Sequence, residues 1–344
     1  MANLTRILSI DGGGIRGIIP GKVLVYVEHK LQEKTGKPDA RIAEYFDLIA
    51  GTSTGGILAC IYLCPTKDEP KRPRFSAEEA VDLYLTRGKK IFSRPLWKKI
   101  IGFRGLFDEK YNPHELENAL KDKFGDLKLS ELYKPCLITA YDILLRKTTF
   151  FTRKEAIVDK GRDFLIKNIA RATSAAPTYF EPAKIKSMSK LDYPLIDGGV
   201  FANNPTLCAY AEVRSKFEKL PDTGKPPMAE NMAILSLGTG KPEKERFTYK
   251  RAKKWGAVGW IRPLIDIMMS GVSETVDYQL GQIFDTLPEN KKGQYLRVDG
   301  ELIKAKHDLD EVKGTNLNDL EQDGIRITEE HKKELDKFVD LLVA

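Results

Sequence analysis

Residues 47–59 read DLIAGTSTGGILA, and this run constrains the fold more than any other in the chain. An apolar stretch ending at Ala50 is followed by Gly51-Thr-Ser53-Thr-Gly55 and then by small and aliphatic residues suited to a helix. The pattern G-x-S-x-G at a strand-to-helix junction is typical of a tight turn that exposes the serine hydroxyl. It predicts an α/β protein in which Ser53 follows a buried strand.

Strand and helix patterns alternate along most of the chain. Strands are expected at 5–10, 46–50, 136–142, 148–152, 193–196, 232–237 and 295–298. Helices are expected at 20–35, from the serine turn to Cys64, and at 76–90, 112–124, 162–173, 206–217 and 328–344. The alternation predicts a mostly parallel sheet with helices on both faces. We expect a single domain over residues 1–344, with its core motifs at 5–240 and a mostly helical part at 241–344.

The composition excludes several classes of protein. The net charge of +7 comes from acids and bases that alternate along the chain, and no nucleic-acid motif accompanies it, so we expect no nucleic acid polymer as partner. No apolar run approaches the ~18–20 residues of a membrane span. The N-terminus has no apolar signal-peptide core, which predicts a cytoplasmic protein.

The four cysteines, Cys60, Cys64, Cys136 and Cys208, each lie in an apolar stretch. They are expected to be buried free thiols in a reducing compartment. No histidine or second cysteine pair accompanies them at metal-ligand spacing, so we expect no metal site.

The loop Gly12-Gly-Gly14-Ile-Arg16-Gly17 follows the first strand and formally satisfies G-x-G-x-x-G. A dinucleotide site would also need an acid at the end of the second strand, and that strand ends at Ala50 without one. A Walker A loop is excluded because Gly240-Lys241 is followed by proline. We therefore expect no nucleotide cofactor.

Glycines 12, 13 and 14 offer unobstructed backbone N–H groups that can converge on one anion. Beside a nucleophilic serine, such a loop can serve as an oxyanion hole, with Arg16 supporting it. The alternative is a tight turn without a catalytic role.

A nucleophilic serine needs a base, and the chain has only four histidines. His29, His114 and His331 fall at polar or terminal positions of expected helices. His307 is the one loop candidate and preserves a Ser–Asp–His order, but its charged neighbours favour a solvated loop.

Asp197 is better placed, because it ends an apolar strand and is followed by Gly198 and Gly199. An aspartate near its usual pKa of ~3.9 is a weak base, and burial would raise that pKa. The Ser53–Asp197 pair is therefore our prediction, with Gly51, Gly55, Gly198 and Gly199 shaping its turns.

Three ordered motifs, 11–17, 51–55 and 197–199, give the chain a strong resemblance to patatin-like phospholipases. Residues 172–180, 235–240, 254–256 and 295–298 also resemble plant patatins in the same order. The resemblance implies a three-layer α/β/α fold with a nucleophile elbow. It further implies a serine hydrolase that cleaves lipid acyl esters, from phospholipids or other glycerolipids, through an acyl-enzyme formed by Ser53 and Asp197. Glycines 12–14 would form the oxyanion hole, and no metal is implied.

Unlike plant patatins, the chain has no secretion signal, so a bacterial or otherwise intracellular member fits better. Some bacterial relatives are membrane-degrading effectors switched on by cyclic oligonucleotides, and no motif here identifies such an activator. Two alternatives to the dyad remain: a Ser–His–Asp esterase using His307, and a catalytically silent membrane-binding or storage protein. The intact Ser53, Asp197 and glycine loop argue against the silent protein. The sequence makes no prediction of oligomeric state.

Residues 87–104 are a candidate for contact with lipid, because basic residues there are interleaved with apolar ones and the stretch includes Trp97, Lys98 and Lys99. Cationic side chains attract anionic headgroups, and tryptophan favours the interface. Peripheral membrane contact and a solvated helix with a buried apolar stripe fit this stretch equally. For the similar stretch at 249–262 we favour the solvated helix.

Overall fold

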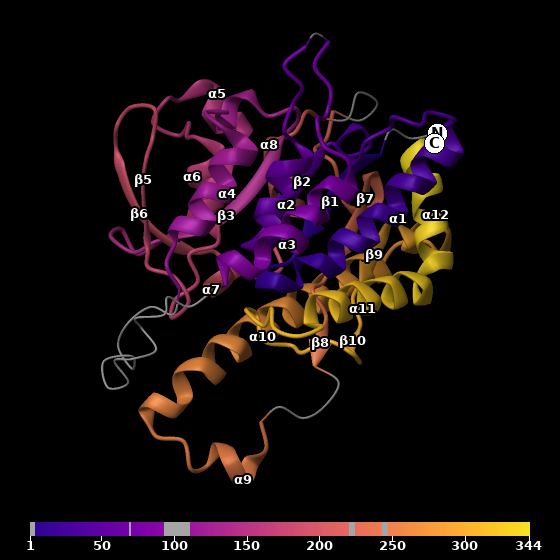
Figure 1. Cartoon of the computed structure of the whole chain (residues 1–344). Coiled ribbons are helices and arrows are strands. Elements are labelled where there is room, and N and C mark those ends of the chain that lie inside the picture. Colours follow the sequence, from indigo (N-terminus) through magenta and orange to yellow (C-terminus); the bar gives the residue numbers. More distant parts are fainter. Residues whose placement is uncertain (1–3, 69, 93–110, 220–223, 243–246) are drawn as a thin grey trace.

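The computed structural model describes residues 4–344 except 69, 93–110, 220–223 and 243–246. An eight-stranded sheet forms its centre, in the order β5–β6–β3–β2–β1–β7–β9 with β4 paired to β3 (Figure 1). These strands are β1 (Thr5–Ile10), β2 (Leu48–Gly51), β3 (Cys136–Asp142), β4 (Lys147–Thr152), β5 (Ala183–Lys186), β6 (Asp192–Asp197), β7 (Met232–Leu237) and β9 (Tyr295–Val298). β8 (Lys241–Pro242) and β10 (Glu301–Leu302) form a separate two-stranded sheet.

The middle of the sheet is parallel. β1 pairs in parallel with β2 on one side and with β7 on the other. β3, β4, β5 and β6 add antiparallel pairs at one side. The strands that follow β1 in sequence are thus added first on its β2 side, and β7 and β9 are added later on its opposite side. In open α/β sheets, ligands bind at the carboxyl ends of the strands at such a reversal.

Helices cover both faces of the sheet, which makes three layers (Figure 1). The main helices are α1 (Ile18–Thr35), α2 (Thr54–Tyr62), α3 (Ala77–Ile91), α4 (His114–Phe124), α6 (Ile166–Thr173), α8 (Thr206–Lys216), α10 (Ala257–Asp285), α11 (Asn316–Glu330) and α12 (Lys332–Val343). Shorter helices are α5 (Arg153–Val158), α7 (Gly199–Ala202) and α9 (Tyr249–Ala252).

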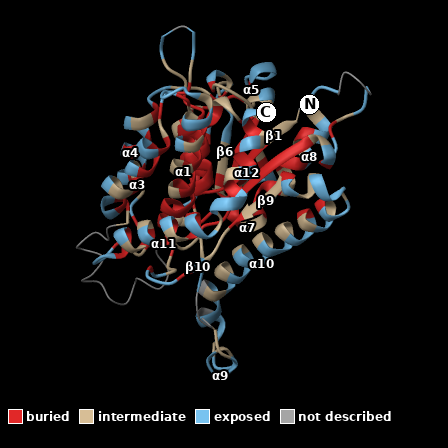
Figure 2. Cartoon of the chain, turned by 90° about the vertical axis from the view of Figure 1, so that its right-hand side faces the viewer, coloured by how far each residue is buried: buried red, intermediate tan, exposed pale blue. Residues whose placement is uncertain are grey.

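Alternate residues of each central strand enter different hydrophobic clusters, because successive strand side chains point to opposite faces. Leu8 and Ile10 of β1 belong to the larger cluster, which includes residues of α1, α2 and α3. Ile7 belongs to the smaller cluster, which includes residues of α8 and α10. The buried residues accordingly concentrate around the sheet (Figure 2).

The mixed α/β fold and every expected strand are confirmed, with ends that match the expectation or differ by at most two residues. β5 was not expected, because its four residues AKIK are too short a run to give a clear strand pattern. The helix expected over 328–344 is wrong as a single element. α11 ends at Glu330 and α12 begins at Lys332, and the intervening His331 places its Nδ1 3.0 Å from the carbonyl oxygen of Ile327.

The cysteines are free: Cys60, Cys64 and Cys136 are buried and Cys208 is half-buried. Within the described ranges, no helix combines the length and the apolar character needed to cross a bilayer.

Candidate active site

Ser53 occupies a strained turn between β2 and α2. Its backbone has φ 53° and ψ −121°, a conformation that L residues rarely adopt, and it caps the N-terminus of α2. Backbone strain of this kind is concentrated at functional sites. The turn is tight because a Cβ at Gly51 would lie 2.2 Å from the Gly55 carbonyl oxygen, and one at Gly55 would lie 2.1 Å from that of Ile10. Only glycine fits at either position.

Buried hydroxyl groups hold this turn. The Ser53 amide donates to Thr173 Oγ1 at 2.9 Å, and Thr52 Oγ1 donates to the Ala202 carbonyl at 2.6 Å. Thr52 Oγ1 also lies 2.7 Å from Thr139 Oγ1. The strained conformation is therefore fixed from β3, α6 and α7, and the serine side chain makes none of these contacts.

Asp197 lies at the end of β6 and is 2% exposed. The Gly199 amide donates to its Oδ1 at 2.7 Å, whereas Oδ2 is buried without a hydrogen-bond partner among the described residues. Burial raises the pKa of Asp197 to about 7, although the nearby Ser53 hydroxyl and the Gly199 amide lower it. The Ser53 hydroxyl is thus near this carboxylate without a hydrogen bond of normal geometry. Such contacts often tighten only when substrate binds.

The glycine loop begins directly after β1. A Cβ at Gly12 would lie 3.3 Å from Ser53 Cβ, so the loop passes beside the serine. Gly14 has φ +58°, and a Cβ there would lie 2.1 Å from the Leu309 carbonyl oxygen. Our expectation for Gly12 needs correction, because its amide donates to the Asn203 carbonyl at 3.0 Å and is not available to an anion. In the part of the chain that the structure describes, the amides of Gly13 and Gly14 donate to no backbone carbonyl.

Several side chains hold the carbonyl oxygens of this loop. Arg16 donates to the Gly13 carbonyl at 3.4 Å and to the Gly240 carbonyl at 3.1 Å. Thr239 Oγ1 and Asn203 Nδ2 both donate to the Gly12 carbonyl, at 3.0 Å and 3.3 Å. Because these side chains hold the carbonyl oxygens of Gly12 and Gly13, the loop can direct amides toward the serine.

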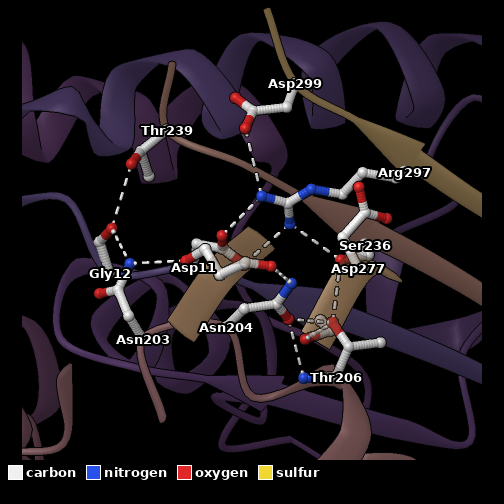
Figure 3. A network of polar contacts seen from close by, with 12 residues as sticks. Asp11, Gly12, Asn203, Asn204, Thr206, Ser236, Thr239, Asp277, Arg297 and Asp299 are labelled. Atoms are coloured by element: carbon white, nitrogen blue, oxygen red, sulfur yellow. Dashed lines mark hydrogen bonds and ion pairs between the residues drawn. The ribbon is translucent and has the colours of Figure 1, made fainter. Parts of the chain in front are cut away.

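A buried ion network lies behind the loop (Figure 3). Arg297 of β9 binds both carboxylate oxygens of Asp11, at 3.0 Å and 2.7 Å, and Asp299 at 3.2 Å. Arg297 also donates to Ser236 at 2.9 Å. Burial raises the pKa of Asp11 to about 6, and Arg297 opposes that rise. This bidentate pair fixes the residue that precedes the glycine loop.

Sequence reasoning missed Asn203, Thr239 and Arg297 as parts of the site. Each lies in a segment that resembles plant patatins or follows the Asp197 motif, so its place in the sequence could have indicated a role in the site. Its residue type could not have done so, because Asn, Thr and Arg are common on protein surfaces.

Ser53 and Asp197 both line a narrow apolar pocket, of ≈ 70 Å³. Its wall comes mainly from α2, α3, α4 and the segment after α6. The apolar side chains on it are Ile15, Ile57, Leu83, Tyr84, Ile91, Phe92, Leu116, Ala119, Leu120, Tyr179, Phe180, Met269 and Leu309. An acyl chain is the kind of group that this wall can bury.

The histidines lie elsewhere. His307 lines a neighbouring polar pocket that does not contain Ser53 or Asp197. The side chains of His29 and His114 are 58% and 76% exposed, and each lies near a glutamate. Among the described residues no cluster of His, Cys, Asp and Glu could hold a metal ion.

The expected membrane residues Trp97, Lys98 and Lys99 lie outside the described residues. The second basic stretch differs from our expectation of a helix with a buried apolar stripe. Residues 249–268, called the arm below, comprise α9 and the first part of α10 and project from the body of the protein (Figure 1). The arm exposes Tyr249, Trp260, Ile261, Leu264, Ile267 and Met268.

Known proteins are similar to this chain in sequence. A sequence model of the family described as patatin-like phospholipase matches residues 8–210. Patatin-like protein 2 of Oryza sativa subsp. indica is 35% identical over 354 residues, covering 97% of this chain and 86% of the rice protein. Patatin-like protein 1 of Arabidopsis thaliana is 36% identical over 341 residues, covering 94% of this chain and 81% of that protein. VipD from Legionella pneumophila, a solved structure, aligns with 96% of this chain and 67% of its own at 12% identity and a TM-score of 0.37.

Proposed function

Because the chain belongs to the patatin-like phospholipase family, whose members are lipid acyl hydrolases, we propose that it cleaves acyl esters of glycerolipids with a Ser53–Asp197 dyad. The observation that carries the proposal is the position of both residues on one apolar pocket. The buried Asp197 carboxylate, whose Oδ2 has no hydrogen-bond partner among the described residues, suits a general base, and its pKa of about 7 lies near physiological pH.

In the proposed reaction, Asp197 accepts the Ser53 proton while Oγ attacks the ester carbonyl carbon. The carbonyl oxygen, which becomes negatively charged, accepts hydrogen bonds from the amides of Gly13 and Gly14. The positive end of the α2 helix dipole also stabilises this charge. Asp197 then protonates the departing lysolipid oxygen. Water, deprotonated by Asp197, then attacks the acyl-enzyme carbonyl. The bond to Ser53 Oγ breaks, Asp197 returns its proton to Oγ, and the fatty acid is released.

The arm supports a proposal of peripheral contact with the membrane. Its exposed aromatic and aliphatic side chains lie in a segment that also carries Lys250, Arg251, Lys253 and Lys254. Trp255 packs edge-on against Trp260, with ring centroids 4.9 Å apart, so the aromatic groups form one cluster. Farther along α10, Met269 lines the apolar pocket. One helix would thus connect the lipid surface with the site.

The test is release of fatty acid from phospholipid vesicles in EDTA by wild type, Ser53→Ala and Asp197→Asn. We expect release by wild type only, with all three proteins equally folded by circular dichroism. A His307→Ala variant serves as the control for the alternative triad and should retain activity. Full activity of Ser53→Ala, or loss in His307→Ala with intact folding, would contradict the dyad.

A further inference from the structure

A wide pocket, lined by charged and polar as well as apolar side chains, lies beside the apolar one. Its volume is ≈ 630 Å³, against ≈ 70 Å³ for the apolar pocket, which places it in the size range of small-molecule sites. Met269 and Leu309 line both pockets, and the glycine loop contributes Arg16 to the wide pocket and Gly14 to the apolar one. A molecule with its reacting ester at Ser53 can therefore extend a polar group into the wide pocket.

One wall of this pocket is a single stripe of α10. The stripe consists of Asp266, Met269, Ser270, Ser273, Glu274 and Asp277. These positions recur at intervals of three and one, so they occupy one face of the helix. Met269 on this face and the adjacent Ile267, which also lines the pocket, are apolar, and the other residues of the face offer carboxylates and hydroxyls. It therefore attracts a group that is positively charged and donates hydrogen bonds.

The remaining walls carry positive charge. The charges come from Arg16 in the glycine loop and from Lys241 in β8. Arg297 also lines the pocket, but Asp11 and Asp299 balance its charge. Hydroxyls of the same walls, from Thr239, Thr248 and Tyr249, can add hydrogen bonds.

A buried acceptor lines the wide pocket. Asn203 is 5% exposed and lines the wide pocket, and its Oδ1 has no hydrogen-bond partner among the described residues. A Cβ at Gly12 would lie 2.4 Å from this oxygen and one at Gly199 3.2 Å, so the oxygen faces both catalytic turns. A buried acceptor without a protein partner indicates that a ligand or a water molecule donates a hydrogen bond to it in the working enzyme.

From these observations we infer that the wide pocket binds a zwitterionic phospholipid headgroup. Its phosphate lies toward Arg16 and Lys241, and its ammonium group lies toward Asp266 and Glu274. The inference rests on the proposed lipid hydrolysis and adds the headgroup that the enzyme prefers. An anionic headgroup with hydroxyls in place of the ammonium group would lack the ion pairs with Asp266 and Glu274.

The experiment compares phosphatidylethanolamine with phosphatidylglycerol of identical acyl chains, each dilute in nonionic-detergent micelles so that surface charge stays constant. We expect kcat/KM to favour phosphatidylethanolamine by roughly three- to tenfold, as a partly exposed ion pair allows. In the double variant Asp266→Asn/Glu274→Gln, this ratio should fall toward one. Equal kcat/KM for the two lipids in wild type, or an unchanged ratio in the double variant, would overturn the headgroup site.

The matched control is Asp285→Asn, which removes an exposed carboxylate from the other end of α10 and should leave the ratio unchanged. Hydrolysis of p-nitrophenyl butyrate, which has no headgroup, reports separately on the dyad. Hydrolysis of this ester without headgroup preference would overturn the inference and leave the proposed function standing. Failure to hydrolyse any of the esters would overturn both.

Discussion

The catalytic turns and the arm are built in opposite ways. Ser53, Asp197 and the glycine loop are buried, and their positions are fixed by close backbone contacts and hydrogen bonds from several elements. The arm depends on one long helix, and its apolar residues lie exposed: Trp260 is 40% and Leu264 49% accessible. Under the proposed function, the positioning of the reacting groups and the contact with lipid depend on different regions, so substitutions should affect them separately.

The largest expected effect comes from the nucleophile. Ser53→Ala should lower the rate of fatty-acid release by on the order of 10⁴ or more, because no other group can form the acyl-enzyme. Its binding to anionic vesicles, measured by sedimentation, should equal that of wild type. Lost vesicle binding in a folded Ser53→Ala protein would show that the two regions are coupled.

The glycine loop should give the next largest effect. Gly14→Ala places a Cβ against the Leu309 carbonyl at a positive φ, so the loop must shift and its amides lose their direction. We expect kcat to fall by about 10²–10³, as for loss of one oxyanion donor. Gly36→Ala is the matched control, because Gly36 also has positive φ but no atom within 4 Å of its Cβ position. Similar losses of kcat in both variants would contradict a role for the loop.

The pH dependence should follow Asp197. As a base it must be ionised, and its pKa is raised to about 7. The kcat/KM for a soluble ester should therefore rise about tenfold per pH unit below 7 and level off above it. A profile already flat from pH 5 upward would mean that this carboxyl is not the base.

The arm should give the smallest effect. Trp260→Ala with Ile261→Ser should weaken vesicle binding by roughly three- to tenfold, since each removes apolar surface available to the interface. Hydrolysis of a soluble ester should not change. Val158→Ser is the control, because Val158 is 81% exposed on α5, at the opposite end of the protein from α9 (Figure 1). Equal effects of both changes would contradict a specific role for the arm.

Local chemistry made much of the site predictable. The glycines around Ser53 and after Asp197 are required by close contacts within a few residues or with the neighbouring strand. The short sequence motifs therefore predict the shape of these turns. The unexpected parts depend on distant pairings: Arg297 reaches Asp11 from β9, and Asn203 holds Gly12. The exposure of the arm could not be predicted either, because a helix with apolar residues is normally expected to bury them.

The burial of two carboxyl groups has a thermodynamic consequence. The pKa values of Asp197 and Asp11 are raised from 3.8 to about 7 and about 6, so the folded protein holds these protons more tightly than the unfolded chain. The stability that this provides is complete below about pH 4 and is lost as the pH rises toward 7. At neutral pH the ionised Asp197 therefore opposes folding, and Asp197→Asn should melt at a higher temperature than wild type. Selection for heat resistance alone would favour the loss of catalysis.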